Sequence, residues 1–186
     1  MSRVPKRIPA HLIDTPIRSR RRGGSGLGRG TLDHVRFRRP FRGVVRLASF
    51  EGGRASPQRT RALFPEESAR IAAQNYVPLL RPGERFSHTT ALLLQGVPIR
   101  CTEDLHVLAP APYAPTRRPG VIGHRTRAAS AASGGPVCDG SAPNSARNGI
   151  ASIDPRTYCV APMDALLQSA GQLPFRELLV AVDALI

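Results

Sequence analysis

Three histidines in one stretch of the chain are the residues best suited to chemistry. His88, His106 and His124 could converge on a metal ion, with Cys101 or Asp104 as a further ligand, because imidazole, thiolate and carboxylate groups all bind transition metals. No pair of them has the short spacing of familiar zinc motifs such as H-x-x-x-H or C-x-x-C. The interpretation that we favour is structural: His88 packs or caps at a helix start, and the other two lie on the wetter faces of strands. The sequence therefore predicts no metal and no cofactor.

Catalytic motifs are also missing from the sequence. Ser87, His88 and Asp104 could be drawn as a hydrolytic set, but adjacent side chains point to different sides, and no G-x-S-x-G turn is present. Metal-dependent nucleases of the usual kind need an aspartate near Glu-x-Lys, and Lys6 is the only lysine. The glycines between residues 23 and 30 match neither the dinucleotide pattern nor the P-loop pattern. We therefore expect no enzymatic activity from this chain.

Positive charge is concentrated near the N-terminus. The formal net charge is +14 over 186 residues, and residues 1–46 hold 13 Lys or Arg against Asp14 and Asp33, which leaves +11 in that quarter. Arginines that neutralise phosphates give salt-sensitive binding to nucleic acid, and residues 1–30 contain no aromatic side chain for base stacking. The alternative is a GC-driven arginine content without a binding role. The predicted partner is nucleic acid, and DNA is the kind that we expect. The predicted contacts are Arg18, Arg20, Arg21, Arg22, Arg36, Arg38, Arg39 and Arg42.

No targeting signal is visible along the chain. It lacks a run of about 18 apolar residues, so we expect no membrane partner. The basic start is not followed by an apolar segment, which argues against a secretory signal. The three cysteines are odd in number and widely spaced, which does not suggest a disulfide framework. We therefore expect a cytoplasmic protein.

The hydrophobic patterns predict an α+β fold behind a flexible basic arm. Residues 1–30 are rich in glycine and arginine and form the arm, residues 31–186 form the domain, and residues 126–149 are a low-complexity loop. A small mixed sheet is expected from about 35–47, 99–108, 119–125 and 150–160, with arginines on one face of the first segment and apolar residues on the other. Helices are expected near 65–80, 87–95, 162–170 and 174–186.

Two of the predicted helices carry more detailed expectations. Ser87 is a good N-cap residue, because its hydroxyl can accept a hydrogen bond from a backbone N–H of the first turn. The last helix should present an apolar stripe by its spacing of three and four residues. That stripe contains Phe175, Leu178, Leu179, Val182, Leu185 and Ile186. The stripe runs to the last residue, which indicates either a docked terminus or a missing continuation.

An ordered set of short motifs resembles one group of proteins. The pieces are PFRGVVR at 40–46, FSHTTA at 86–91, GVP at 96–98, LHV at 105–107, RPGVIGHR at 118–125 and ELLVAVDALI at 177–186. In this order they resemble actinobacterial proteins related to the AbiEi-type antitoxins of abortive-infection systems. Many of those proteins continue into an endonuclease domain similar to the very-short-patch-repair nuclease.

The resemblance implies a function but no catalytic residue. It implies a non-enzymatic, antitoxin-like or defence-associated regulatory module, with a cognate toxin or nuclease as a partner. The alternative is the accessory region of a phage-defence or repair-type DNA endonuclease whose catalytic domain, expected after Ile186, is missing. The chain departs from the group in two places. Residues 126–149 are of low complexity where a glycine-led segment and a strand are usual, and residues 1–30 show no winged helix.

Overall fold

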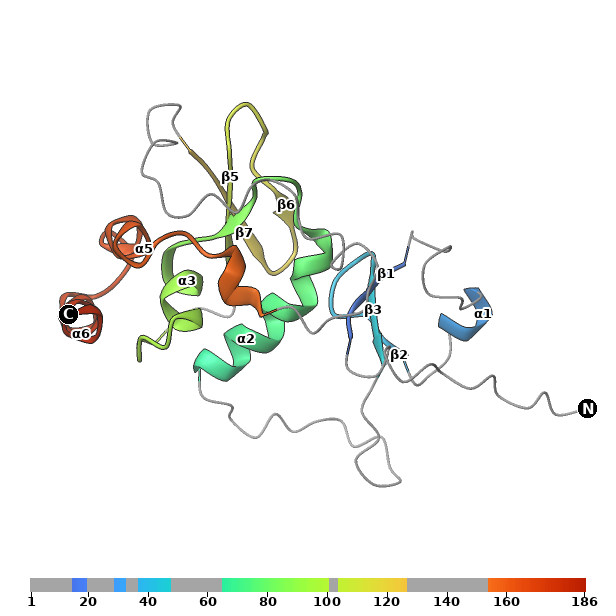
Figure 1. Ribbon diagram of the computed structural model, residues 1–186, viewed down its shortest axis with the longest axis horizontal. Coiled ribbons are helices and arrows are strands. Elements are labelled where there is room, and N and C mark those ends of the chain that lie inside the picture. Colours follow the sequence, from blue (N-terminus) through green and yellow to red (C-terminus); the bar gives the residue numbers. More distant parts are fainter. Residues whose placement is uncertain (1–14, 20–28, 33–36, 48–64, 101–103, 127–153) are drawn as a thin grey trace, which may run out of the picture.

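The chain folds as α+β, as the sequence predicts, with two small sheets and several short helices (Figure 1). The computed structural model describes residues 15–19, 29–32, 37–47, 65–100, 104–126 and 154–186. One sheet lies near the N-terminal end of the molecule, and helices α5 (Pro162–Ser169) and α6 (Phe175–Leu185) lie at the opposite end (Figure 1). Within the described residues, every helix is too short or too polar to cross a bilayer.

The N-terminal sheet has three short antiparallel strands in the order β1 (Ile17–Arg18), β3 (Val44–Leu47), β2 (Phe37–Arg38). Val44 and Val45 are both buried, and neighbouring residues on a strand point to opposite faces. Apolar residues are therefore buried on both faces of β3. The predicted apolar and positive faces are therefore present except at Val44. Ile17, Phe37, Val45 and Leu47 share one face, and Arg18, Arg38 and Arg46 share the other with the buried Val44. Arg39 and Arg42 lie in the β2–β3 turn.

This sheet changes two further expectations. Residues 37–47 do not join the main sheet, because β3 is fully occupied by its two neighbours, β1 and β2. The expectation of a flexible arm does not hold at residues 15–19, since Ile17 is buried with Leu32 of the short helix α1 (Arg29–Leu32). Residues 29 and 30 of the predicted arm begin α1. The rest of the predicted arm, and nearly all of the predicted loop at 126–149, lie outside the described residues.

The main sheet is mixed, as predicted, with the order β4 (Arg85–Phe86), β5 (Leu105–Ala109), β7 (Val121–Arg125), β6 (Arg117–Arg118). Strands β5 and β7 are parallel, and the other pairs are antiparallel. Gly123 of β7 lies so close to the loop before β6 that an added Cβ would be 2.1 Å from the backbone oxygen of Thr116. No side chain larger than a hydrogen fits at this position.

Two predicted strand segments are corrected. The segment 99–108 forms a strand only from Leu105, and residues 101–103 lie outside the described part. In the described part of the segment 150–160, residues 154–160, the 3-10 turn η4 (Pro155–Tyr158) takes the place of a strand, and Cys159 forms an isolated bridge with Phe86. Residues 150–153 lie outside the described part. The Asp154 carboxylate accepts a hydrogen bond from the Arg156 N–H at 3.0 Å and closes the turn, so an extended strand cannot form there.

The helices occupy the predicted ranges and enclose two core clusters. Helix α2 (Pro65–Tyr76) continues into the 3-10 turn η2 (Val77–Leu79), lies between the two sheets, and contacts both β3 and β5. One cluster contains Tyr76, Phe86 and Val107, and the other joins α3 (His88–Leu94) to α5. On α6 the predicted stripe is rotated, because Ala181 is fully buried while Phe175 is 81% exposed.

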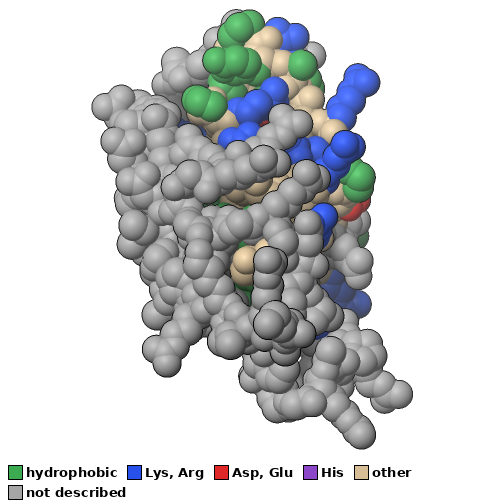
Figure 2. All heavy atoms as spheres, turned by 90° about the vertical axis from the view of Figure 1, so that its right-hand side faces the viewer, with side chains coloured by type: hydrophobic (Ala, Val, Ile, Leu, Met, Phe, Trp, Pro, Cys, Tyr) green, Lys and Arg blue, Asp and Glu red, His purple; other side chains and the backbone are tan. Residues whose placement is uncertain are grey.

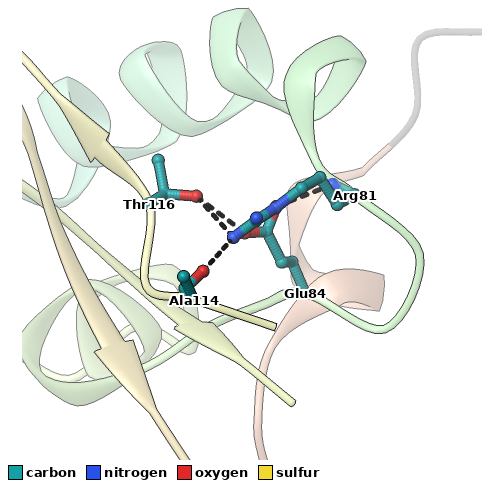
Figure 3. Close-up of polar contacts among 4 residues, drawn as sticks. All are labelled: Arg81, Glu84, Ala114 and Thr116. Carbon is teal, nitrogen blue, oxygen red and sulfur yellow. Dashed lines mark hydrogen bonds and ion pairs between the residues drawn. The ribbon is translucent and has the colours of Figure 1, made fainter. Parts of the chain in front are cut away.

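A buried carboxylate connects the end of α2 to the loop before β6 (Figure 3). Glu84 is 3% exposed and accepts hydrogen bonds from the Arg81 side chain at 2.6 and 2.8 Å and from the Thr116 hydroxyl at 2.7 Å. The same guanidinium donates to the Ala114 carbonyl at 2.6 Å. We call this set the Arg81–Glu84 clamp. It fixes the backbone of residues 114–116, against which Gly123 packs, and so helps to position β7.

Candidate functional site

Three histidines that are far apart in the sequence meet beside the main sheet. Nδ1 of His106 lies 2.9 Å from Nε2 of His124, and the ring of His88 stacks on that of His124 with centroids 3.7 Å apart. One ring nitrogen from each residue can be chosen so that the three atoms all lie within 4.8 Å of one another. We call His88, His106 and His124 the histidine cluster. Among the described residues, it is the one group of three or more potential metal ligands.

The register of two parallel strands brings His106 and His124 together. His106 pairs with Ile122, and Leu108 pairs with His124. Paired residues share a face and alternate residues return to it, so both histidines project from the same face of the sheet. The opposite face of the same strands packs into the core through Leu105, Val107 and Val121.

His88 reaches the cluster through an unusual backbone conformation. The N–H of Ser87 donates to the carbonyl of His106 at 3.0 Å, which places the start of α3 beside β5. His88 then has a φ of 50°, and it is the one non-glycine residue with a positive φ in the described ranges. Residues other than glycine rarely adopt this left-handed region, and such strain persists only where the surroundings impose it.

The serine before His88 is a partner of the imidazole rather than a helix cap. Ser87 Oγ lies 3.0 Å from Nδ1 of His88 and takes no hydrogen bond from the first turn of α3. Two predictions are therefore wrong. The Ser87 hydroxyl does not cap the helix, and the side chains of Ser87 and His88 do not point to different sides. The left-handed backbone of His88 changes the direction of its side chain, so that the ring reaches back to the preceding hydroxyl. Ser87 is completely buried, which prevents its use as a hydrolytic nucleophile.

Burial keeps the histidine cluster neutral near neutral pH. It lowers the pKa of His88 to about 4, and the repulsion that His124 and then His106 exert when protonated lowers this pKa further. Burial likewise lowers the pKa of His106 to about 4, and it also lowers that of His124. A neutral imidazole has one N–H and one free lone pair, which is the form that binds metals.

The positions of the histidines agree only in part with the sequence. The prediction that His88 packs at a helix start is confirmed. His106 was expected on the more solvent-exposed face of its strand. It is only 4% exposed, because its ring lies against the rings of His88 and His124. Only His124 is partly open to solvent. Asp104 is exposed and is not part of the cluster, and Cys101 lies outside the described residues.

A second candidate site is formed by arginines around the N-terminal sheet. Arg18, Arg38, Arg39 and Arg42 are exposed, and Figure 2 shows basic side chains gathered on this end of the molecule, with few acidic ones in view. Arg18 pairs with Val44 and Arg38 pairs with Arg46, so these strand arginines project from the same face of the sheet. The other predicted contacts, Arg20, Arg21, Arg22 and Arg36, lie outside the described residues.

One arginine of the main sheet extends this surface, and the sequence did not predict it as a contact. Arg118 donates a hydrogen bond from its guanidinium to the carbonyl of Arg42 at 3.1 Å, which joins β6 to the β2–β3 turn. Their separation of 76 positions hides this proximity in the sequence. We call Arg18, Arg38, Arg39, Arg42 and Arg118 the arginine surface.

Comparisons of the chain with protein-family models, with curated proteins and with solved structures gave no match. The resemblance to AbiEi-type antitoxins therefore stays a prediction from the sequence motifs.

Proposed function

We propose that this chain is a cytoplasmic, non-enzymatic, antitoxin-like regulatory module. It binds nucleic acid, of which DNA is the expected kind, through the arginine surface. One observation supports this proposal most strongly. The described residues between 15 and 47 contain six arginines and no acidic residue, and Arg18, Arg38, Arg39 and Arg42 are exposed around one small sheet. Such a concentration of guanidinium groups neutralises phosphates, releases their counterions and supplies sequence-independent affinity.

The kind of contact follows from which groups are exposed. Phe37 and Phe41, the aromatic residues of this sheet and its turn, are partly buried, and the ring of Phe41 packs edge-on against Tyr76 at 5.2 Å. They offer no platform for base stacking. Arginine forks fit phosphate oxygens in a bidentate manner, so the proposed contact is with the nucleic-acid backbone. The affinity should then depend strongly on salt and only weakly on base sequence.

A salt titration of DNA binding tests this proposal. For the full chain we expect the logarithm of the binding constant to fall linearly with the logarithm of the salt concentration. Replacing Arg38, Arg39 and Arg42 together by alanine should reduce the slope by up to about 2.7, because each phosphate that is no longer neutralised removes about 0.9. The matched control replaces three exposed arginines elsewhere and should leave the slope nearly unchanged. Its positions are Arg70, Arg156 and Arg176. Equal reductions in the two triple variants would refute the arginine surface as the binding site.

The antitoxin role and its alternative differ in what accompanies the chain. The sequence resemblance supports both an antitoxin with a toxin partner and the accessory region of a defence endonuclease. The coding DNA around the gene separates them. A neighbouring gene for a toxin-like nucleotidyltransferase supports the antitoxin role. A reading frame past Ile186 that encodes an aspartate and Glu-x-Lys supports the endonuclease alternative and argues against the antitoxin role.

A further inference from the structure

We propose that the histidine cluster binds one divalent transition-metal ion of the zinc class, with one imidazole nitrogen each from His88, His106 and His124 as ligands. The three ligands come from three different elements, the start of α3, β5 and β7, so the ion would tie the helix to the sheet. This role is separate from nucleic-acid binding, because none of the three residues belongs to the arginine surface.

The distances are close to those that a bound ion requires. Zinc holds imidazole nitrogens at about 2.0–2.1 Å, so tetrahedral ligand atoms lie about 3.3 Å from one another. In the cluster the His106 and His124 nitrogens are 2.9 Å apart, and the chosen ligand atoms all lie within 4.8 Å. Binding therefore requires the hydrogen-bonded pair to open by a few tenths of an ångström. It also requires the His88 ring to turn out of its stack on His124, which is a side-chain rotation.

The proton positions are compatible with binding. The Nδ1 atom of His88 faces Ser87 Oγ at 3.0 Å, so a proton on Nδ1 leaves Nε2 as the ligand. His106 and His124 share one proton in their hydrogen bond. When Nδ1 of His106 and Nε2 of His124 both bind the ion, the shared proton dissociates. The second ring nitrogen of the imidazole that carried this proton is then protonated from water. Each ring then still has one N–H, and no net proton is released.

The cluster also has the surroundings of a ligand site. The left-handed backbone of His88 keeps its ring beside His124, and strain of this kind at a non-glycine residue concentrates at functional sites. The partial exposure of His124 gives an ion access from solvent. The group offers nitrogen atoms and no carboxylate, which favours zinc, cobalt, nickel or copper over magnesium and calcium. With three protein ligands, a fourth position is open to water.

The test uses the full chain purified without a histidine tag and stripped with a chelator. Zinc is then titrated in competition with a chromophoric chelator, and we expect one ion per chain. Cobalt in the same site should show the intense visible bands of four-coordinate Co²⁺. The His124→Gln variant should lose affinity by more than about 100-fold, because it lacks a ligand, and Ser87→Ala should lose about 10- to 100-fold, because it lacks the group that orients His88.

A matched control and a measurement on the unaltered protein complete the test. Cys159 is another potential zinc ligand outside the cluster, so Cys159→Ser should bind zinc as the parent chain does. In the parent chain, ring-nitrogen NMR signals of three histidines should shift on addition of zinc. The proposal is overturned if the folded parent chain binds no zinc at one equivalent. It is also overturned if other histidines shift, or if a folded His124→Gln protein binds as the parent does.

Discussion

The Arg81–Glu84 clamp allows a prediction whose size follows from the contacts. Arg81→Met removes the cation that faces a carboxylate with a side chain only 1% exposed. Breaking a fully buried ion pair costs roughly 3–5 kcal/mol, because the remaining charge is buried without compensation. Here the Arg81 side chain is 39% exposed, which screens part of the attraction. Glu84 also keeps hydrogen bonds from the Arg81 backbone N–H and from the Thr116 hydroxyl, both at 2.7 Å.

We therefore expect Arg81→Met to lower the free energy of unfolding by about 2–3 kcal/mol at neutral pH. The measurement is urea denaturation followed by circular dichroism. The double variant Arg81→Met with Glu84→Gln should lose less than the sum of the two single variants, because it leaves no buried charge. Arg70→Met, at an exposed position of α2, is the control and should change stability by no more than about 0.5 kcal/mol.

The acid dependence gives an independent check. Burial raises the pKa of Glu84, but the hydrogen bonds from the Arg81 side chain and backbone, and then from Thr116, outweigh it, and the pKa is lowered from its ordinary value of 4.5. A lowered carboxyl pKa stabilises the fold above the ordinary value, and this contribution is lost as the pH falls through the folded value. The difference between the parent chain and Arg81→Met should therefore shrink in acid. A difference that stays constant below the ordinary carboxyl pKa, or a loss under about 0.5 kcal/mol at neutral pH, would refute the reasoning.

Other positions give simpler expectations. Gly123→Ala should lower the free energy of unfolding, measured by urea denaturation, by about 3 kcal/mol, because its Cβ would lie 2.1 Å from the backbone oxygen of Thr116. A variant as stable as the parent chain would contradict that close approach. Leu92→Ala, at a fully buried residue, should lower the free energy of unfolding by about 2–5 kcal/mol, whereas Leu167→Ala, at a residue that is 71% exposed, should lower it by less than about 0.5 kcal/mol. Similar losses in the two variants would contradict the assigned core. Burial raises the pKa of the Cys159 thiol to about 12, so mass spectrometry should find it unalkylated by iodoacetamide at neutral pH in the native protein, and rapid labelling would contradict its burial.

The sequence predicts the features that depend on local chemistry. Helix α2 begins at Pro65 with two glutamates in its first turn, and α5 begins at Pro162, and both starts are visible as sequence signals. The strand at residues 121–125 follows from its β-prone residues. The buried face of α6 is harder to predict, because Phe175 and Leu179 fit the helical spacing as well as Leu178 does. Which residues face inward depends on the packing of α6 against α5.

The features that escape prediction depend on long-range pairing. The meeting of His106 with His124 requires the register of two parallel strands, which leaves no mark in the spacing of the residues. The approach of His88 requires a left-handed residue at the start of α3, a conformation that the histidine itself does not favour. Likewise, Arg118 of one sheet contacts the β2–β3 turn of the other across 76 positions of sequence. The histidine cluster and part of the arginine surface are therefore visible only in the folded chain.

Helix α3 has a consequence for how the protein unfolds. All of its residues from His88 to Leu94 are buried, and a helix of seven residues is not stable on its own. Leu92 and Leu93 belong to one core cluster, while Leu94 belongs to the other. Neither cluster can therefore open fully without loss of the same helix, which couples the two cores into one cooperative unit. The backbone amides of α3 should accordingly be among the slowest in the described chain to exchange with deuterium, and they should exchange only through global unfolding.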